Sequence, residues 1–216
     1  MKKILLLILI GLVASPFLSN SEIQDNRSSV ILNKLSKTYK TYKSVKASFK
    51  IKIDNKQNNT SVTQSGVLYQ KGKKFKVNIS GQEISCDGKT IWTYIEDANE
   101  VQISKFDPKS IDINPSEIFT IYEKGFLHSY GGQKKVGSST LDIVKLTPVD
   151  KNKSYFLVKL SVDKLANKIK EMSVHNKNGL ITKYSISKFE PNVNINDSYF
   201  KFNPKDKPGV IEIDLR

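Results

Sequence analysis

The sequence predicts an α+β fold in which a few helices cover one face of a large antiparallel sheet. Three observations predict it: one amphipathic helical segment near the N-terminus, a long run of short alternating segments, and one break in that run at Asn114-Pro115. Runs of strands with few helices are typical of this class. A chain of 216 residues can bury a sizeable core, and no internal repeat divides it, so one domain is expected.

The chain opens with the pattern of an export signal. Met-Lys-Lys precedes an apolar run over residues 4–14, which stops before Pro16. A membrane-spanning helix needs about 20 apolar residues, and this run is shorter. Residues 1–19 are therefore interpreted as a signal peptide and residues 20–216 as the mature domain. The only cysteine, Cys86, is too far along the chain to carry a lipid anchor, so the mature protein is expected to be soluble in the periplasm.

The first expected element is an amphipathic helix. Between residues 28 and 42, apolar side chains recur at helical spacing with lysines between them. Further along, the period changes to two, because Phe49 and Ile51 alternate with lysines. This alternation is typical of a half-buried strand.

A meander of short strands is expected next. Each strand alternates apolar with polar residues, and turn residues such as Asp87-Gly88 separate it from its neighbour. The expected strands cover residues 62–70, 75–79, 83–86, 90–94 and 100–106.

The run of strands breaks after residue 113. Asn114 suits a helix cap, Pro115 suits the first helical position, and Glu117 suits the first turn. A short helix is therefore expected to begin here and to stop at Gly125. Strands are expected to resume after Gly131-Gly132, over residues 141–146, 155–162, 169–175 and 180–189.

Lysine dominates the charge of the chain. The formal net charge is +14, and Arg27 and Arg216 are the only arginines. Proteins that read bases and phosphates rely on the planar fork of arginine, whereas lysine is a hydrated point charge. No basic cluster interleaved with aromatic residues is present, so no nucleic acid partner is expected.

The sequence carries few residues suited to catalysis. His128 and His175 are the only histidines, and neither has a metal ligand at suitable spacing. Neither a phosphate-binding loop nor a nucleophile elbow occurs. We therefore expect no enzyme activity, no metal and no cofactor. Cys86 is expected to be a small buried hydrophobic residue.

Several motifs together resemble one family. The stretch CDGKTIWTY over residues 86–94 is similar to the DGKTLWxY hairpin of the outer-membrane lipoprotein carrier (LolA) family. VKASFKI, GVLYQKGKKFKVN and the ending FKFNPKDKPGVIEI are similar to family features in the same order. The resemblance implies an incomplete antiparallel β-barrel, covered by a few helices, that encloses an apolar cavity.

The resemblance also implies a function. Family members are periplasmic carriers, which bind the acyl chains of lipoproteins in the cavity and shuttle them from the inner to the outer membrane. The implied partners are an inner-membrane ATP-driven lipoprotein exporter and an outer-membrane acceptor, and the implied state is a monomer. A lipid-binding envelope-stress sensor on the same half-barrel is the alternative function.

The resemblance assigns candidate lipid-binding residues to strands and to the covering helix. They are Phe49, Ile51, Phe75, Val77, Ile79, Ile84, Ile118, Phe119, Ile121 and Tyr122. An ordinary core requires the same side chains, so residue chemistry alone does not separate the two interpretations. Members of the family often carry Arg-Pro where this chain has Lys71-Gly72. The resemblance therefore implies that Lys71 is the lid latch, with an ammonium in place of a guanidinium fork.

Overall fold

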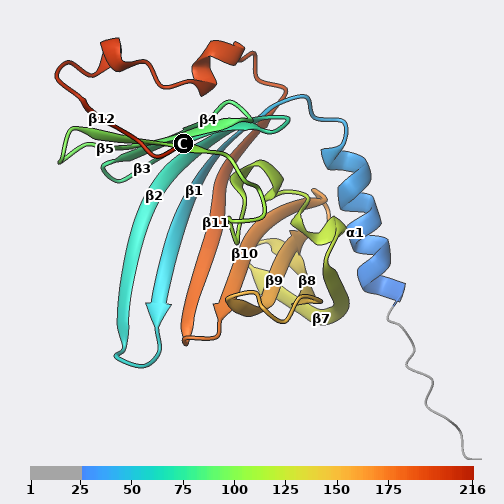
Figure 1. The fold of residues 1–216 in the computed structure, drawn as a ribbon. Helices are drawn as coiled ribbons and strands as arrows, with labels where there is room; N and C mark the ends of the chain where they lie inside the picture. Colours follow the sequence, from blue (N-terminus) through green and yellow to red (C-terminus); the bar gives the residue numbers. More distant parts are fainter. Residues whose placement is uncertain (1–25) are drawn as a thin grey trace, which may run out of the picture.

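The computed structural model describes residues 26–216, and the expected signal peptide lies outside these residues. The described residues form a twelve-stranded sheet that curves strongly and stays open (Figure 1). The helices are α1 (Asn26–Tyr39) and the short 3₁₀ turns η1 (Pro115–Glu117), η2 (Ile121–Glu123), η3 (Asp197–Phe200) and η4 (Pro204–Asp206). The predicted mostly antiparallel, curved and unclosed sheet is thus confirmed.

Two meanders make up most of the sheet. The first contains β1 (Val45–Asn55), β2 (Thr60–Lys71), β3 (Lys74–Ile79), β4 (Gln82–Cys86), β5 (Thr90–Ile95) and β6 (Glu100–Lys105). The second contains β7 (Phe126–Val136), β8 (Ser139–Pro148), β9 (Tyr155–Asp163), β10 (Lys168–Asn176) and β11 (Leu180–Pro191). The strands β1 and β11 pair in antiparallel fashion and join the two meanders. The last strand, β12 (Ile211–Asp214), pairs in parallel with β6 at one edge.

The sheet has an inner and an outer face. The helix α1 packs at the β7 end of the inner face through the buried side chains of Leu32, Leu35 and Tyr39. We call residues 113–123, which include η1 and η2, the covering segment, because they lie over the inner face of the central strands (Figure 1). Residues 192–210, the C-terminal segment, lie on the outer face of the first meander and lead to β12 at its edge.

The expected helix after Asn114 is only two 3₁₀ turns. The side chain of Asn114 accepts a hydrogen bond from the backbone N–H of Ser116, as expected of a cap. The backbone leaves the helical region at Thr120, where φ is −129°, and η2 has no side-chain cap. Ile118, Thr120 and Ile121 are β-branched and disfavour a regular helix. The helical segment thus begins at the expected cap and ends before Gly125, but it consists of two 3₁₀ turns instead of one short helix.

The second difference is β7, which runs through Gly131-Gly132 where the sequence predicted no strand. The ladder with β8 shifts register between Tyr130 and Gln133, and Gly132 has a φ of 93°. A Cβ atom on Gly131 would lie 3.0 Å from Ile143 Cγ2, so the glycine pair allows a bulge inside the strand. The pair therefore bends a strand rather than separating two elements.

Candidate functional site

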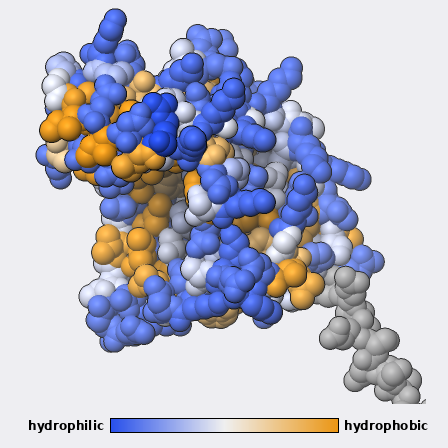
Figure 2. All heavy atoms as spheres, viewed as in Figure 1, coloured by the Kyte–Doolittle hydropathy of each residue, from blue (hydrophilic) through white to orange (hydrophobic). Residues whose placement is uncertain are grey.

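An apolar pocket of about 250 Å³ lies between the inner face of the sheet and the covering segment. Its walls come from β1 to β4, from β10 and β11, and from the covering segment. The lining residues are Ala47, Phe49, Ile51, Leu68, Val77, Ile79, Ile84, Ile113, Pro115, Ile118, Phe119, Ile169, Met172, Tyr184 and Ile186. In Figure 2, apolar side chains are visible in the hollow in front of β1 and β2.

The lining is almost entirely hydrocarbon. Tyr184 is the one lining residue whose side chain carries a polar group, and burial raises the pKa of its hydroxyl. A pocket of this kind offers water no set of hydrogen-bond partners. Ligand pockets usually have volumes of about 300–1,000 Å³, so this one is small. The chemistry of the lining suits an aliphatic chain, and the volume suits only part of one.

Most of the candidate lipid-binding residues lie at this pocket. Seven of the ten line it: Phe49, Ile51, Val77, Ile79, Ile84, Ile118 and Phe119. Phe75 and Tyr122 belong instead to the buried core next to the pocket, and burial raises the pKa of Tyr122. Ile121 lies at a separate surface pocket with Phe126 and Tyr155.

Eight lining residues were absent from the sequence-based set. They are Ala47, Leu68, Ile113, Pro115, Ile169, Met172, Tyr184 and Ile186. Strand alternation could have found two of them, because Ala47 and Leu68 lie on the inner face of strands that the alternation already predicts. The residues on β10 and β11 reach the pocket only through the pairing of β1 with β11, which no local pattern indicates.

The position of Phe49 depends on a glycine. Gly66 lies directly opposite Phe49 on β2, and a Cβ atom there would lie 2.7 Å from both Phe49 Cζ and the backbone oxygen of Asn78. Only glycine therefore leaves room for the phenylalanine ring at this pocket wall.

The covering segment is held over the pocket by a few contacts. Phe119 stacks on Tyr39 of α1, with the ring centroids 5.4 Å apart. The side-chain amide of Gln70 on β2 donates a hydrogen bond to the carbonyl oxygen of Ser116. These contacts join the covering segment to both α1 and the sheet.

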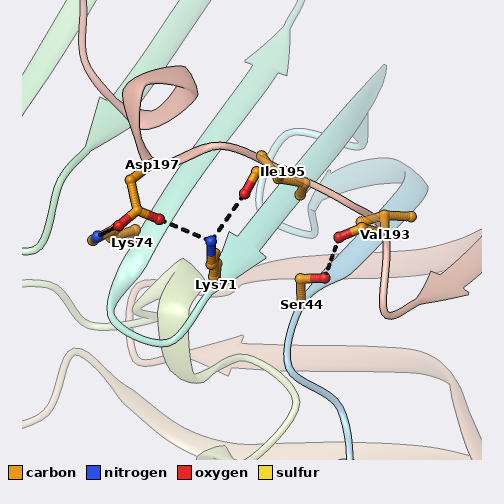
Figure 3. A network of polar contacts seen from close by, with 6 residues as sticks. All are labelled: Ser44, Lys71, Lys74, Val193, Ile195 and Asp197. Atoms are coloured by element: carbon orange, nitrogen blue, oxygen red, sulfur yellow. Dashed lines mark hydrogen bonds and ion pairs between the residues drawn. The ribbon is translucent and has the colours of Figure 1, made fainter.

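Lys71 contacts the C-terminal segment (Figure 3). Its ammonium donates a hydrogen bond to the carbonyl oxygen of Ile195 at 2.9 Å and lies 2.9 Å from Asp197 Oδ1. Lys74 binds the other carboxylate oxygen, and hydrogen bonds from Lys74 and Lys71 lower the pKa of Asp197 to about 2. Because neighbouring side chains on a strand point to opposite faces, Gln70 faces the covering segment and Lys71 faces away from it.

This pair of neighbours yields a prediction. Gln70→Leu removes the hydrogen bond to Ser116, so local opening of the covering segment should become roughly fivefold more frequent, the equivalent of about 1 kcal/mol. Hydrogen–deuterium exchange should therefore speed up around residues 116–120. Lys71→Leu is the matched control and should speed up exchange only around residues 192–200. Faster exchange of the covering segment in Lys71→Leu alone would contradict this division and favour a lid latch at Lys71.

The environments of Cys86 and His128 indicate structural roles. Cys86 is buried, and burial raises the pKa of its thiol to about 11. His128 hydrogen-bonds through Nδ1 to Ser28 of α1, at 3.0 Å. Within residues 26–216, no cluster of histidine, cysteine and carboxylate side chains is placed to hold a metal ion. No helix in the same range is long and apolar enough to cross a membrane.

An open, curved sheet with an apolar pocket under a covering segment defines a half-barrel protein. The family model described as outer membrane lipoprotein carrier protein LolA matches residues 40–203, which is most of the chain. The chain therefore belongs to the LolA family. No curated protein sequence matches it.

Solved structures are similar to this chain at low sequence identity. An uncharacterized conserved protein from Thermus thermophilus is 12% identical, with 87% of this chain and 99% of that chain covered and a TM-score of 0.57. A DUF1329 family protein from Desulfovibrio piger is 14% identical, with 82% and 96% covered and a TM-score of 0.50. A LolA superfamily protein from Nitrosomonas europaea is 12% identical, with 81% and 97% covered and a TM-score of 0.45.

Proposed function

We propose that this protein is a periplasmic carrier that binds the acyl chains of lipoproteins in the apolar pocket and shuttles them from the inner to the outer membrane. The observation that carries the proposal is the lining of the pocket, in which only Tyr184 contributes a polar side-chain group. Membership of the LolA family supports the same class of cargo. The proposed partners are an inner-membrane ATP-driven exporter and an outer-membrane acceptor, and the carrier acts as an exported monomer.

The free energy of burying an acyl chain and the size of the pocket together indicate how the protein is loaded. Each buried methylene contributes about 0.8 kcal/mol, so an acyl chain leaves a membrane only for an equally apolar site. A pocket of about 250 Å³ holds only part of such a chain. Loading therefore requires the covering segment to move away from the sheet. It is attached by the Phe119 ring contacts, the buried side chain of Tyr122, the hydrogen bond from Gln70 and the ion pair between Glu123 and Lys40. The other walls are strands held by continuous backbone ladders, so the covering segment is the part of the wall that is easiest to displace.

The proposal predicts that a charge in the pocket weakens lipid binding. Ile84→Glu places a carboxylate at the half-buried end of the pocket, and binding of a fluorescent fatty acid should weaken roughly tenfold or more, since an acyl chain cannot solvate a charge. Ile181→Glu is the matched control, because Ile181 is also half-buried but lies on the outer face of β11. Binding and thermal unfolding are measured for both variants.

Mass spectrometry of ligands that co-purify with the exported protein completes the test. Acylated peptides or lipids bound to the wild-type protein and absent from Ile84→Glu support the carrier. Equal binding by both variants, with no lipid in the wild-type protein, would refute it. Co-purification of an anti-sigma factor with lipid-loaded protein would favour the envelope-stress sensor.

A further inference from the structure

The outer face of the sheet carries a row of lysines. Lys52 on β1 lies directly opposite Lys183 on β11, and Lys183 lies opposite Ser173 on β10. Ser173 lies opposite Lys159 on β9, which in turn lies opposite Lys145 on β8. Neighbouring strands are about 4.8 Å apart, so these residues form one straight row across five strands. This row, Lys52, Lys183, Ser173, Lys159 and Lys145, is called the lysine row.

The lysine row is unfavourable for folding. Two of its neighbouring pairs, Lys52 with Lys183 and Lys159 with Lys145, place like charges directly opposite each other, which destabilises a sheet. Lys52 is paired with Asp54 at 2.9 Å. Among the ion pairs within residues 26–216, none includes Lys145, Lys159 or Lys183. These three lysines at the centre of this face therefore have no carboxylate of the described residues at ion-pair distance.

The carboxylates on the same face are already occupied. Glu171 on β10 pairs with Lys134 at 3.0 Å, and Glu190 on β11 pairs with Lys188 at 3.0 Å. The histidine of this face, His175, lies next to the row, and its pKa is lowered by burial and then by the charges of Lys159, Lys56 and Lys183. The positive field of several lysines thus converges here.

An exposed aromatic residue borders the row. Phe156 is 52% exposed, and its ring lies 6.2 Å from that of His175, which faces outward on the neighbouring strand β10. Lysines beside an exposed aromatic side chain are the combination that binds the charged and apolar layers of a membrane surface. Protein partners instead favour interfaces whose core is depleted of charge.

We propose that this outer face, opposite the pocket, docks the protein on an anionic phospholipid surface. The lysine row lies against the headgroups, and Phe156 enters the boundary between headgroups and acyl chains. Lysine suits this role because it attracts diffuse negative charge without requiring a fixed partner geometry. Docking through the outer face leaves the covering segment on the opposite side of the sheet free to move.

The test is co-sedimentation of the mature protein with vesicles. Wild-type protein should bind phosphatidylglycerol vesicles at low salt, bind phosphatidylcholine vesicles weakly, and dissociate as salt screens the charges. Lys159→Gln/Lys183→Gln should weaken binding to phosphatidylglycerol roughly 25-fold, since each lysine near such a surface contributes about fivefold. The same variant should melt at a higher temperature, because it relieves both like-charge pairs.

The control removes the same net charge elsewhere. Lys109 and Lys205 are exposed and lie outside the row, so Lys109→Gln/Lys205→Gln should leave vesicle binding close to that of wild type. Equal weakening in both double variants, or binding that does not depend on anionic lipid, would overturn the proposal. Ile84→Glu should still bind phosphatidylglycerol vesicles, so failure of the carrier function and failure of docking are distinguishable.

Discussion

Phe200→Ala is expected to destabilise the domain by about 3–5 kcal/mol, the cost of emptying a fully buried phenylalanine site. Phe200 is 0% exposed and lies in η3, which packs on β3. Its ring fixes the C-terminal segment to the outer face. Without it, the segment should detach and uncover the buried side chains of Tyr94, Val101 and Ile103.

Urea unfolding followed by circular dichroism measures this effect. Phe156→Ala is the control, because Phe156 is 52% exposed and its truncation should change the free energy of unfolding by less than about 1 kcal/mol. If Phe200→Ala lowered the free energy of unfolding as little as Phe156→Ala, the C-terminal segment would contribute little to the stability of the sheet.

Ala47→Phe is expected to abolish acyl-chain binding without lowering stability. Ala47 is 1% exposed and lines the pocket, so a phenyl ring there occupies the space proposed for the ligand. Filling a pre-existing cavity commonly stabilises a protein by about 0.5–2 kcal/mol. The measurements are binding of a fluorescent fatty acid and the melting temperature.

Two further variants make this result interpretable. Ala47→Leu adds less volume than Ala47→Phe, so it should give an intermediate loss of binding. It serves as the test if the phenyl ring overpacks the site and destabilises the protein. Ala166→Phe changes an exposed residue in the turn between β9 and β10 and should bind like wild type. Undiminished binding by a folded Ala47→Phe protein would place the ligand outside this pocket.

Local patterns predicted the first meander well. The alternation around Phe49 and Ile51 and the turn at Asp87-Gly88 correspond to β1 and to the β4–β5 turn, because these elements are stabilised by neighbours in sequence. The sequence did not predict β7, because this edge strand has no continuous apolar face. Its two adjacent glycines also resemble a turn. A bulge and a turn require the same backbone freedom.

The candidate site was predictable only in part, for two physical reasons. The candidates on β1, β3 and β4 lie on the inner face because alternation fixes the face, and all of them except Phe75 line the pocket. The walls from β10 and β11 depend on long-range pairing, which leaves no local pattern. At Lys71, the sequence could not show that the C-terminal segment passes over the outer face and supplies Ile195 and Asp197 as partners.

The pairing of β1 with β11 has a consequence for the order of folding. Each meander forms from hairpins that are close in sequence, whereas Val45 must find Pro191 across most of the described chain. Closing so long a loop has a high entropy cost, so this seam should form late. The pocket has walls on both sides of the seam and is complete only after that step. A bound acyl chain should therefore slow unfolding of the native protein and leave its folding rate nearly unchanged.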